Sequence, residues 1–147
     1  MPLMPIPASL VLAGGLALIN LWLSARAAQV RRTTGIYVGD GGNDQLIRRM
    51  RAQANLAENA PILFALVLVL ELARGTGPVL WVAAGLILLA RIAHPIGMDG
   101  WKPGRMAGAL LTLVLQLALA LWALSLPLVG GDAGPAPHGI DLPEPRG

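Results

Sequence analysis

Residues 51–70 read RAQANLAENAPILFALVLVL, a polar start followed by a run of apolar side chains. A helix that crosses a bilayer needs roughly 20 mostly apolar residues, yet only 12 uncharged residues follow Glu58 before the next charge. A span of sufficient length must therefore include Arg51, Asn55 and Glu58. Polar side chains at membrane depth normally face the interior of the protein or a water-filled cavity. This stretch predicts a helix bundle within a membrane, with a polar site on an inward face.

The composition of the whole chain also indicates a membrane protein. Of its 147 residues, 55% are hydrophobic and 13% are charged, whereas about 25% are charged in an ordinary soluble domain. The chain has no cysteine, which excludes disulfides, thiolate metal sites and a cysteine nucleophile. Aromatic residues make up only 4% of the chain, so surfaces for stacking nucleic-acid bases are scarce. A soluble enzyme and a nucleic-acid-binding protein are therefore not expected.

Three further runs without charge lie at residues 8–25, 75–90 and 106–131. Together with the helix that begins near Arg51, they predict an all-α membrane protein, an up-down bundle of four transmembrane helices. The predicted spans are residues 8–27, 48–73, 78–97 and 105–127.

These spans form one membrane domain over residues 1–129, and a tail rich in proline and glycine follows at residues 130–147. Such a tail is expected to stay extended unless a protein partner orders it. A cleaved signal peptide is the alternative interpretation of the first span. Residues 1–12 contain no basic residue, however, and a signal peptide usually begins with one. We therefore expect the first helix to remain in the membrane.

Basic residues are distributed unequally between the two ends of the predicted bundle. Nine of the eleven Lys and Arg residues flank the connections between helices one and two and between helices three and four. The other end has only Arg74 and Arg146. Because basic loops tend to stay in the cytoplasm, both of these connections are predicted to be cytoplasmic and both chain ends to lie outside.

One face of the second helix carries its polar residues. Arg51, Asn55 and Glu58 lie at positions i, i+4 and i+7 and share this face, while Gln53 points almost to the opposite side. A structural interpretation is that Arg51 and Glu58 neutralise each other as part of the packing. The functional interpretation is a binding site, because an ionisable residue within a span costs about 2.5–3.5 kcal/mol and usually has a role.

Antiparallel helices bring further charges to the same level of the bilayer. The third helix ends there with Arg91 and His94, and the fourth begins there with Arg105. Together with the polar face of the second helix, this group suits a small zwitterionic molecule with several carboxylates. The arginines would bind the carboxylates, and Glu58 and Asn55 would bind an amine and an amide.

Other polar residues predict local structure only. His94 has no second histidine near it, so a metal site is not expected. Thr112 and Gln116 on the fourth helix are expected to form hydrogen bonds between helices. Glu71 and Arg74, three residues apart, are expected to form a solvated pair at the outer surface.

The polar start of the second helix resembles the signature of a known family. Residues 51–61, RAQANLAENAP, match in register the pattern R-x-Q-x-N-x-x-E-x-x-P of the membrane-associated proteins in eicosanoid and glutathione metabolism, the MAPEG family. The end of the third helix, LARIAH at residues 89–94, and Arg105 also look like the family's pattern. The resemblance covers roughly residues 10–126. Residues 39–42, GDGG, look most like the small bacterial branch.

The family contains the microsomal glutathione transferases and leukotriene C synthase, and the resemblance implies a homotrimer of four-helix subunits. For a member of the bacterial branch, the expected location is the inner membrane. Glutathione would bind at each subunit interface on the cytosolic side, with Gln53 reaching the site of the neighbouring subunit. The implied glutathione-binding residues are Arg51, Gln53, Asn55, Glu58, Arg91, His94 and Arg31, with Arg26 as the alternative to Arg31.

The implied activity is that of a glutathione-dependent transferase or peroxidase. Arg105 matches the family's catalytic arginine beside the sulfur, where a cation lowers the pKa of a thiol from about 8.5 and favours the thiolate. The thiolate would then attack a lipophilic electrophile that enters from the lipid bilayer.

Three departures from the family's pattern motivate a second hypothesis. Asn59, His94 and Met98 stand where family members often have tyrosine, and Tyr37 in the first connection is the one tyrosine of the chain. Aromatic contact with the ligand is therefore expected to be lost. The alternative function is a non-catalytic scaffold or accessory subunit of a membrane complex, with the tail as the binding segment for a protein partner. A transporter is not favoured, because ionisable residues do not continue through the outer half of the spans.

Overall fold

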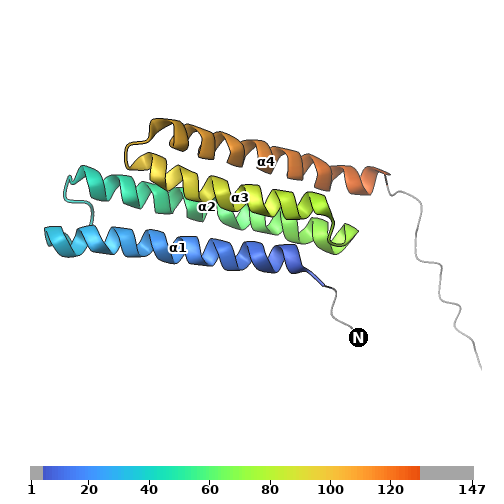
Figure 1. Cartoon of the computed structure of the whole chain (residues 1–147), viewed down its shortest axis with the longest axis horizontal. Helices are drawn as coiled ribbons and strands as arrows, with labels where there is room; N and C mark the ends of the chain where they lie inside the picture. The colour runs from blue at the N-terminus through green and yellow to red at the C-terminus, as the bar shows by residue number, and fades with distance from the viewer. Residues whose placement is uncertain (1–4, 130–147) are drawn as a thin grey trace, which may run out of the picture.

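The computed structural model describes residues 5–129, and four long helices make up most of this part of the chain. α1 spans Pro7–Thr34, α2 spans Asp44–Arg74, α3 spans Pro78–Met98 and α4 spans Lys102–Val129. Successive helices run in opposite directions along the bundle (Figure 1). Each of them is long and apolar enough to cross a membrane. The predicted all-α architecture of four transmembrane helices is therefore confirmed.

The helices extend beyond the predicted spans. α1 continues to Thr34, whereas its span was predicted to end at residue 27, and α2 begins at Asp44 instead of residue 48. With 28 and 31 residues, these helices are longer than the roughly 20 residues that the hydrocarbon core requires. Hydropathy marks only the apolar part of a helix, and the additional turns are polar, with Arg31 and Arg32 in the last turn of α1.

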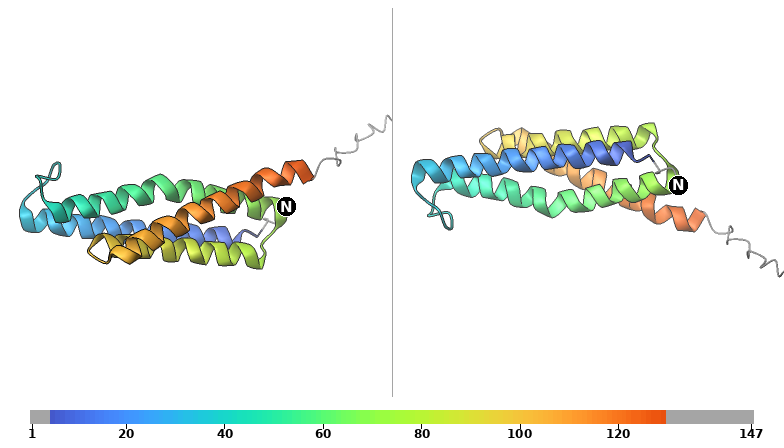
Figure 2. Two further views of the ribbon diagram at one scale, coloured as in Figure 1. Left: turned by 90° about the horizontal axis from the view of Figure 1, so that it is seen from above. Right: turned by 90° about the horizontal axis from the view of Figure 1, so that it is seen from below.

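α2 and α3 form the centre of the bundle. α1 and α4 each pack on both of these helices, and over the described residues α1 and α4 make no contact with each other. Figure 2 shows that α4 crosses the other helices obliquely. The completely buried apolar side chains come from α1, α2 and α3 and include Leu12, Leu63, Val67 and Ile87.

Glycine allows α4 to approach α3 closely. A Cβ atom at Gly108 would lie 2.8 Å from the carbonyl oxygen of Ala90 and 2.8 Å from the backbone nitrogen of His94. Real Cβ atoms essentially never come so near to other atoms, so this position requires glycine. The contact fixes the start of α4 against the part of α3 that carries His94.

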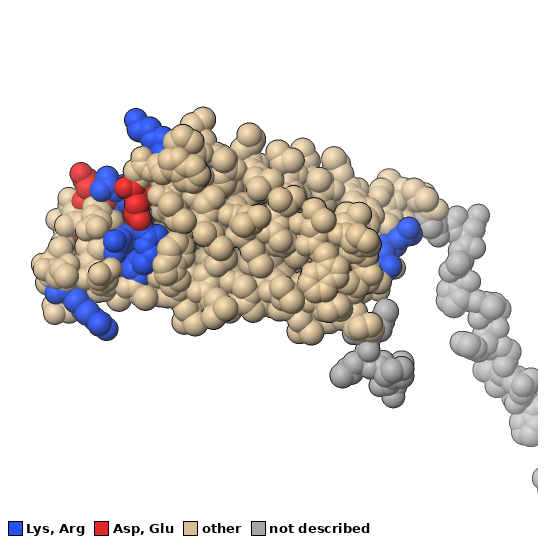
Figure 3. Space-filling model, in the orientation of Figure 1, with Lys and Arg blue, Asp and Glu red and all other residues tan. Residues whose placement is uncertain are grey.

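Charged side chains gather at one end of the molecule, and an uncharged belt separates them from a small basic patch at the other end (Figure 3). The belt includes large apolar side chains that are exposed on α4, among them Leu110, Leu113, Leu117, Leu121 and Leu124. An exposed apolar belt between polar ends is the surface that a bilayer requires.

The predicted solvated pair of Glu71 and Arg74 is wrong. Glu71 is only 1% exposed, because its carboxylate reaches across to the start of α1. It accepts hydrogen bonds from the backbone N–H groups of Ala8 and Ser9, at 3.0 and 2.8 Å. The hydroxyls of Ser9 and Thr76 donate to the same carboxylate, at 2.5 and 2.6 Å. Glu71 thus caps α1, where the partial positive charge of a helix N-terminus favours an anion.

Candidate functional site

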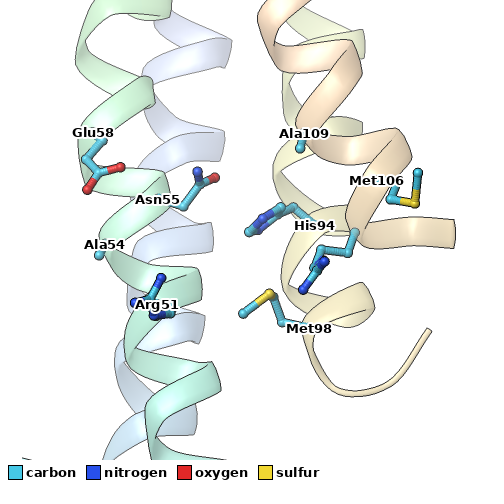
Figure 4. Close-up of a pocket in the computed structure, with 9 residues that line it drawn as sticks. Arg51, Ala54, Asn55, Glu58, His94, Met98, Met106 and Ala109 are labelled. Carbon is cyan, nitrogen blue, oxygen red and sulfur yellow. The ribbon is translucent and has the colours of Figure 1, made fainter. Parts of the chain in front are cut away.

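A pocket of about 700 Å³ lies between α2 on one side and α3 and α4 on the other (Figure 4). It is formed where α2 begins, α3 ends and α4 begins, which is the end of the bundle with most of the charges. The residues that line it are Arg51, Ala54, Asn55, Glu58, His94, Met98, Arg105, Met106 and Ala109.

The structure brings five of the sequence-predicted site residues together in this pocket. Arg51, Asn55 and Glu58 form the wall on α2. His94 on α3 and Arg105 on α4 lie on the opposite wall. Figure 4 shows His94 directed across the gap towards α2.

The local sequence of α2 determines which side chains face the pocket. Asn43 caps the helix by accepting a hydrogen bond from the backbone N–H of Leu46, at 2.9 Å. Ala52 and Leu56 are buried, so the face of α2 that contains them packs inside the bundle. The adjacent face then presents the polar residues to the pocket, as the spacing of i, i+4 and i+7 predicts.

Arg91 lies behind the pocket and does not line it. Its side chain is only 2% exposed, and its Nη1 donates a hydrogen bond of 3.0 Å to Oδ1 of Asn55. Its Nη2 donates to the hydroxyl of Thr112. Within residues 5–129 its Nε has no hydrogen-bond partner. Arg91 therefore joins α3 to both α2 and α4 at the level of the pocket.

Gln53 and Arg31 do not reach the pocket of their own chain. Nε2 of Gln53 donates to the hydroxyl of Ser24 on α1, at 2.8 Å. Nη1 of Arg31 donates to the carbonyl oxygens of Ile36 and Gly39, at 3.1 and 2.9 Å. Arg31 thereby fixes the connection between α1 and α2.

Arg26, the alternative to Arg31, also lies outside the pocket. It forms an ion pair with Asp99 at the end of α3, and its guanidinium lies 4.8 Å from the centre of the Trp22 ring. In a single chain, neither Arg26 nor Arg31 contributes to the pocket.

The charges around the pocket do not cancel. Arg51 and Glu58 share one face of α2, but the structure records no ion pair between them, and Arg26–Asp99 is the pair found among the described residues. Arg51 and Arg105 line the pocket and Arg91 lies behind it, so three cations surround one carboxylate. The structural interpretation, in which Arg51 and Glu58 neutralise each other, therefore lacks the contact that it requires.

Sequence reasoning missed one residue of the pocket, and only one of the two hydrogen-bonding residues that it predicted on α4 forms the expected bond. Met106 lines the pocket. Its position could not be predicted, because it depends on the direction in which α4 begins. Thr112 was expected to bond between helices, and its acceptance of a hydrogen bond from Arg91 confirms that role. Gln116 was expected to do the same, but its Oε1 is buried without a partner in the described part of the chain.

Comparison with known proteins identifies the family. The family model described as MAPEG family matches residues 9–125, which include all the residues that line the pocket. The chain belongs to the MAPEG family. Inner membrane protein YecN of Escherichia coli strain K12 is 28% identical over 120 residues, which cover 77% of this chain and 89% of YecN. The YecN of Escherichia coli O6:H1 strain CFT073 matches to the same extent.

The four apolar helices, together with the relative in the inner membrane, also show where the protein resides. It is a multi-pass protein of the bacterial inner membrane. The matched region extends from α1 to α4, so the whole bundle, and not the polar start of α2 alone, is shared with the family.

Proposed function

We propose that this MAPEG protein is a glutathione-dependent transferase or peroxidase that acts on lipophilic electrophiles within the membrane. One observation carries the proposal: Arg51, Asn55, Glu58 and Arg105, which lie on two helices far apart in sequence, line one pocket. Its volume of about 700 Å³ is within the usual range for sites that hold small organic ligands.

The charges of the pocket support a ligand of this kind. Glutathione carries two carboxylates and one ammonium group. Arg51 and a second cation are available for the carboxylates, and Glu58 for the ammonium group, through charge-assisted hydrogen bonds. The excess of cations over carboxylates around the pocket favours a ligand with net negative charge.

Arg105 is the proposed catalytic residue. A guanidinium is always charged and donates hydrogen bonds only, so its role is to stabilise the thiolate electrostatically and not to remove the proton. The S–H proton passes to water, and the thiolate sulfur forms a bond to the electrophilic carbon. In a substitution the leaving group departs with the electron pair of its bond to that carbon.

A homotrimer is part of the proposal. Gln53, Arg26 and Arg31 lie outside the pocket of their own chain, so they would take part in a site only through a neighbouring subunit. The exposed apolar face of α4 offers surface for contact with such a subunit or with lipid.

The test is calorimetric titration of glutathione into the purified protein in detergent, beside Glu58→Gln, Arg105→Ala and the control Arg74→Ala. Arg74 belongs to the opposite end of the bundle, so its removal should leave binding unchanged. We expect saturable binding that weakens in Glu58→Gln, and thiol-dependent turnover of electrophiles that is lost in Arg105→Ala. Absence of binding by the wild type would contradict the proposal.

A scaffold without catalysis is the second candidate, and the lining of the pocket favours it in one respect. Met98 and His94 stand where synthases of the family have tyrosine, and no side chain that lines the pocket carries a hydroxyl. The proposed binding segment, residues 130–147, lies outside the described residues. Deletion of this tail with no change in the proteins that co-purify would count against the scaffold.

A further inference from the structure

We infer that Arg91 is a positioning residue, which holds Asn55 so that the NH₂ group of its side chain faces the pocket and selects a hydrogen-bond acceptor on the ligand. This inference rests on the proposed function only in that the pocket must bind a ligand. It assigns to Arg91 a role other than direct contact with that ligand.

The orientation of the Asn55 amide follows from the chemistry of arginine. A guanidinium has only donors, so the atom of Asn55 that lies 3.0 Å from Nη1 of Arg91 must be the oxygen. The nitrogen of the amide is then on the other side of the group. The structure records no hydrogen bond from this nitrogen to the described residues, and Asn55 lines the pocket. The two N–H groups are therefore free to bind a carboxylate or carbonyl oxygen.

Thr112 fixes the guanidinium from the other side. Its hydroxyl donates to the carbonyl oxygen of Gly108 at 2.7 Å, so the proton of the hydroxyl is already used. A lone pair of the same oxygen then accepts from Nη2 of Arg91. Nη1 of Arg91 also lies 3.4 Å from the backbone carbonyl oxygen of Asn55. The donor and the acceptor are thus determined for each hydrogen bond in this series, which links Gly108, Thr112, Arg91 and Asn55.

Burial separates Arg91 from the ligand. With 2% of its surface exposed, its side chain cannot contact a molecule in the pocket directly. No carboxylate of the described residues pairs with it. Its charge therefore adds to the positive potential on the side of Asn55, which favours an acceptor that is anionic.

Asn55→Asp is the variant that separates positioning from mere packing. An aspartate at this site keeps the shape of the side chain and replaces the bond to Arg91 by an ion pair, so the protein should unfold at the same or a higher temperature. A carboxylate has no N–H group to offer. We therefore expect the affinity for glutathione to fall roughly tenfold or more, as for the loss of a hydrogen bond to a charged group.

Thr112 supplies a matched pair of variants. Thr112→Ser keeps the hydroxyl that holds Arg91, whereas Thr112→Val keeps the shape and removes it. Thr112→Ser should bind glutathione as the wild type does, and Thr112→Val should bind it several-fold more weakly, although neither side chain lines the pocket. Equal affinities in these two variants, or wild-type affinity in Asn55→Asp, would overturn the inference.

A measurement without ligand keeps this inference distinct from the proposed function. The nitrogen resonance of the Asn55 side-chain amide can be followed in the full-length protein and in Arg91→Lys, which keeps the charge but loses the forked geometry. We expect this resonance to shift in Arg91→Lys and to stay in place in the control Arg74→Lys. An unchanged resonance in Arg91→Lys overturns the inference even if glutathione binds, whereas a shifted resonance without any binding rejects only the proposed function.

Discussion

The carboxylate of Glu71 accepts hydrogen bonds from both the backbone N–H and the hydroxyl of Ser9, at 2.8 and 2.5 Å, across 62 residues of sequence. This contact joins the last turn of α2 to the first turn of α1. It replaces the side-chain cap that α1 lacks at its own N-cap residue, Ile6. The end of the bundle opposite the pocket is thus closed by one buried carboxylate.

Replacing Glu71 should destabilise the protein. In Glu71→Gln the amide oxygen can still accept hydrogen bonds, but the negative charge is lost. The NH₂ group then faces the N–H and O–H donors that one carboxylate oxygen accepts from in the wild type. Loss of hydrogen bonds to a charged group costs about 1.5–3 kcal/mol each, so the temperature of thermal unfolding in detergent should fall clearly. Glu58→Gln is the matched control, because Glu58 is exposed at the pocket, and its unfolding temperature should stay close to that of the wild type.

Gly108→Ala should force α3 and α4 apart at the level of the pocket. The added Cβ would lie 2.8 Å from backbone atoms of Ala90 and His94, and overpacking of this kind typically costs 1–3 kcal/mol. Gly85→Ala on α3 is the control, because a Cβ there meets no atom within 4 Å. Comparison of the two unfolding temperatures tests the close approach, and equal stability of both variants would contradict it.

Arg105→Ala should reduce the ionisation of the glutathione thiol more than it reduces the affinity for glutathione. If Arg105 stabilises the thiolate, the ultraviolet absorbance of bound thiolate should be lost in this variant while glutathione still binds. Arg105→Lys, which keeps the charge, should restore part of the signal. Full thiolate formation in Arg105→Ala would assign the stabilisation to another group.

The orientation in the membrane can be tested because the natural chain has no cysteine. Val38 is 91% exposed in the connection between α1 and α2, and Arg74 is exposed at the opposite end of the bundle. With both basic connections in the cytoplasm, a reagent that cannot cross the inner membrane should label Arg74→Cys and not Val38→Cys in spheroplasts. Labelling of both variants after lysis is the control, and the reverse pattern in spheroplasts would invert the orientation.

The helices and one wall of the pocket could be predicted from sequence, because both depend on local periodicity. Apolar length fixes four spans, and the spacing of Arg51, Asn55 and Glu58 fixes one face of α2. Because successive helices run antiparallel, Arg105 and His94 come to the same level of the bundle as this face, and all of them line the pocket. These inferences need no knowledge of how each helix is rotated about its axis.

The positions of Arg91 and Glu71 could not be predicted in this way. Arg91 is three residues from His94, yet it is turned behind the pocket, because the rotation of α3 depends on the close contact with Gly108. Glu71 is buried by the start of α1, a partner that no local pattern specifies. Gln53 and Arg31 remain predictions, since their proposed roles require a second subunit.

The way in which α4 is held has a mechanical consequence. Three of its four buried residues, Gly104, Gly108 and Thr112, lie in its first half, and Leu119 is the one buried residue beyond them. A helix clamped near one end behaves as a lever: for a given tilt, an atom moves in proportion to its distance from the clamp. Arg105 lies within the clamp, so a tilt of the other half of α4, which packs on the core through partly buried side chains such as Trp122 and Leu126, should displace it least. Membranes of different thickness, or bulky lipid molecules beside the bundle, can therefore be accommodated with little movement of the cation next to the pocket.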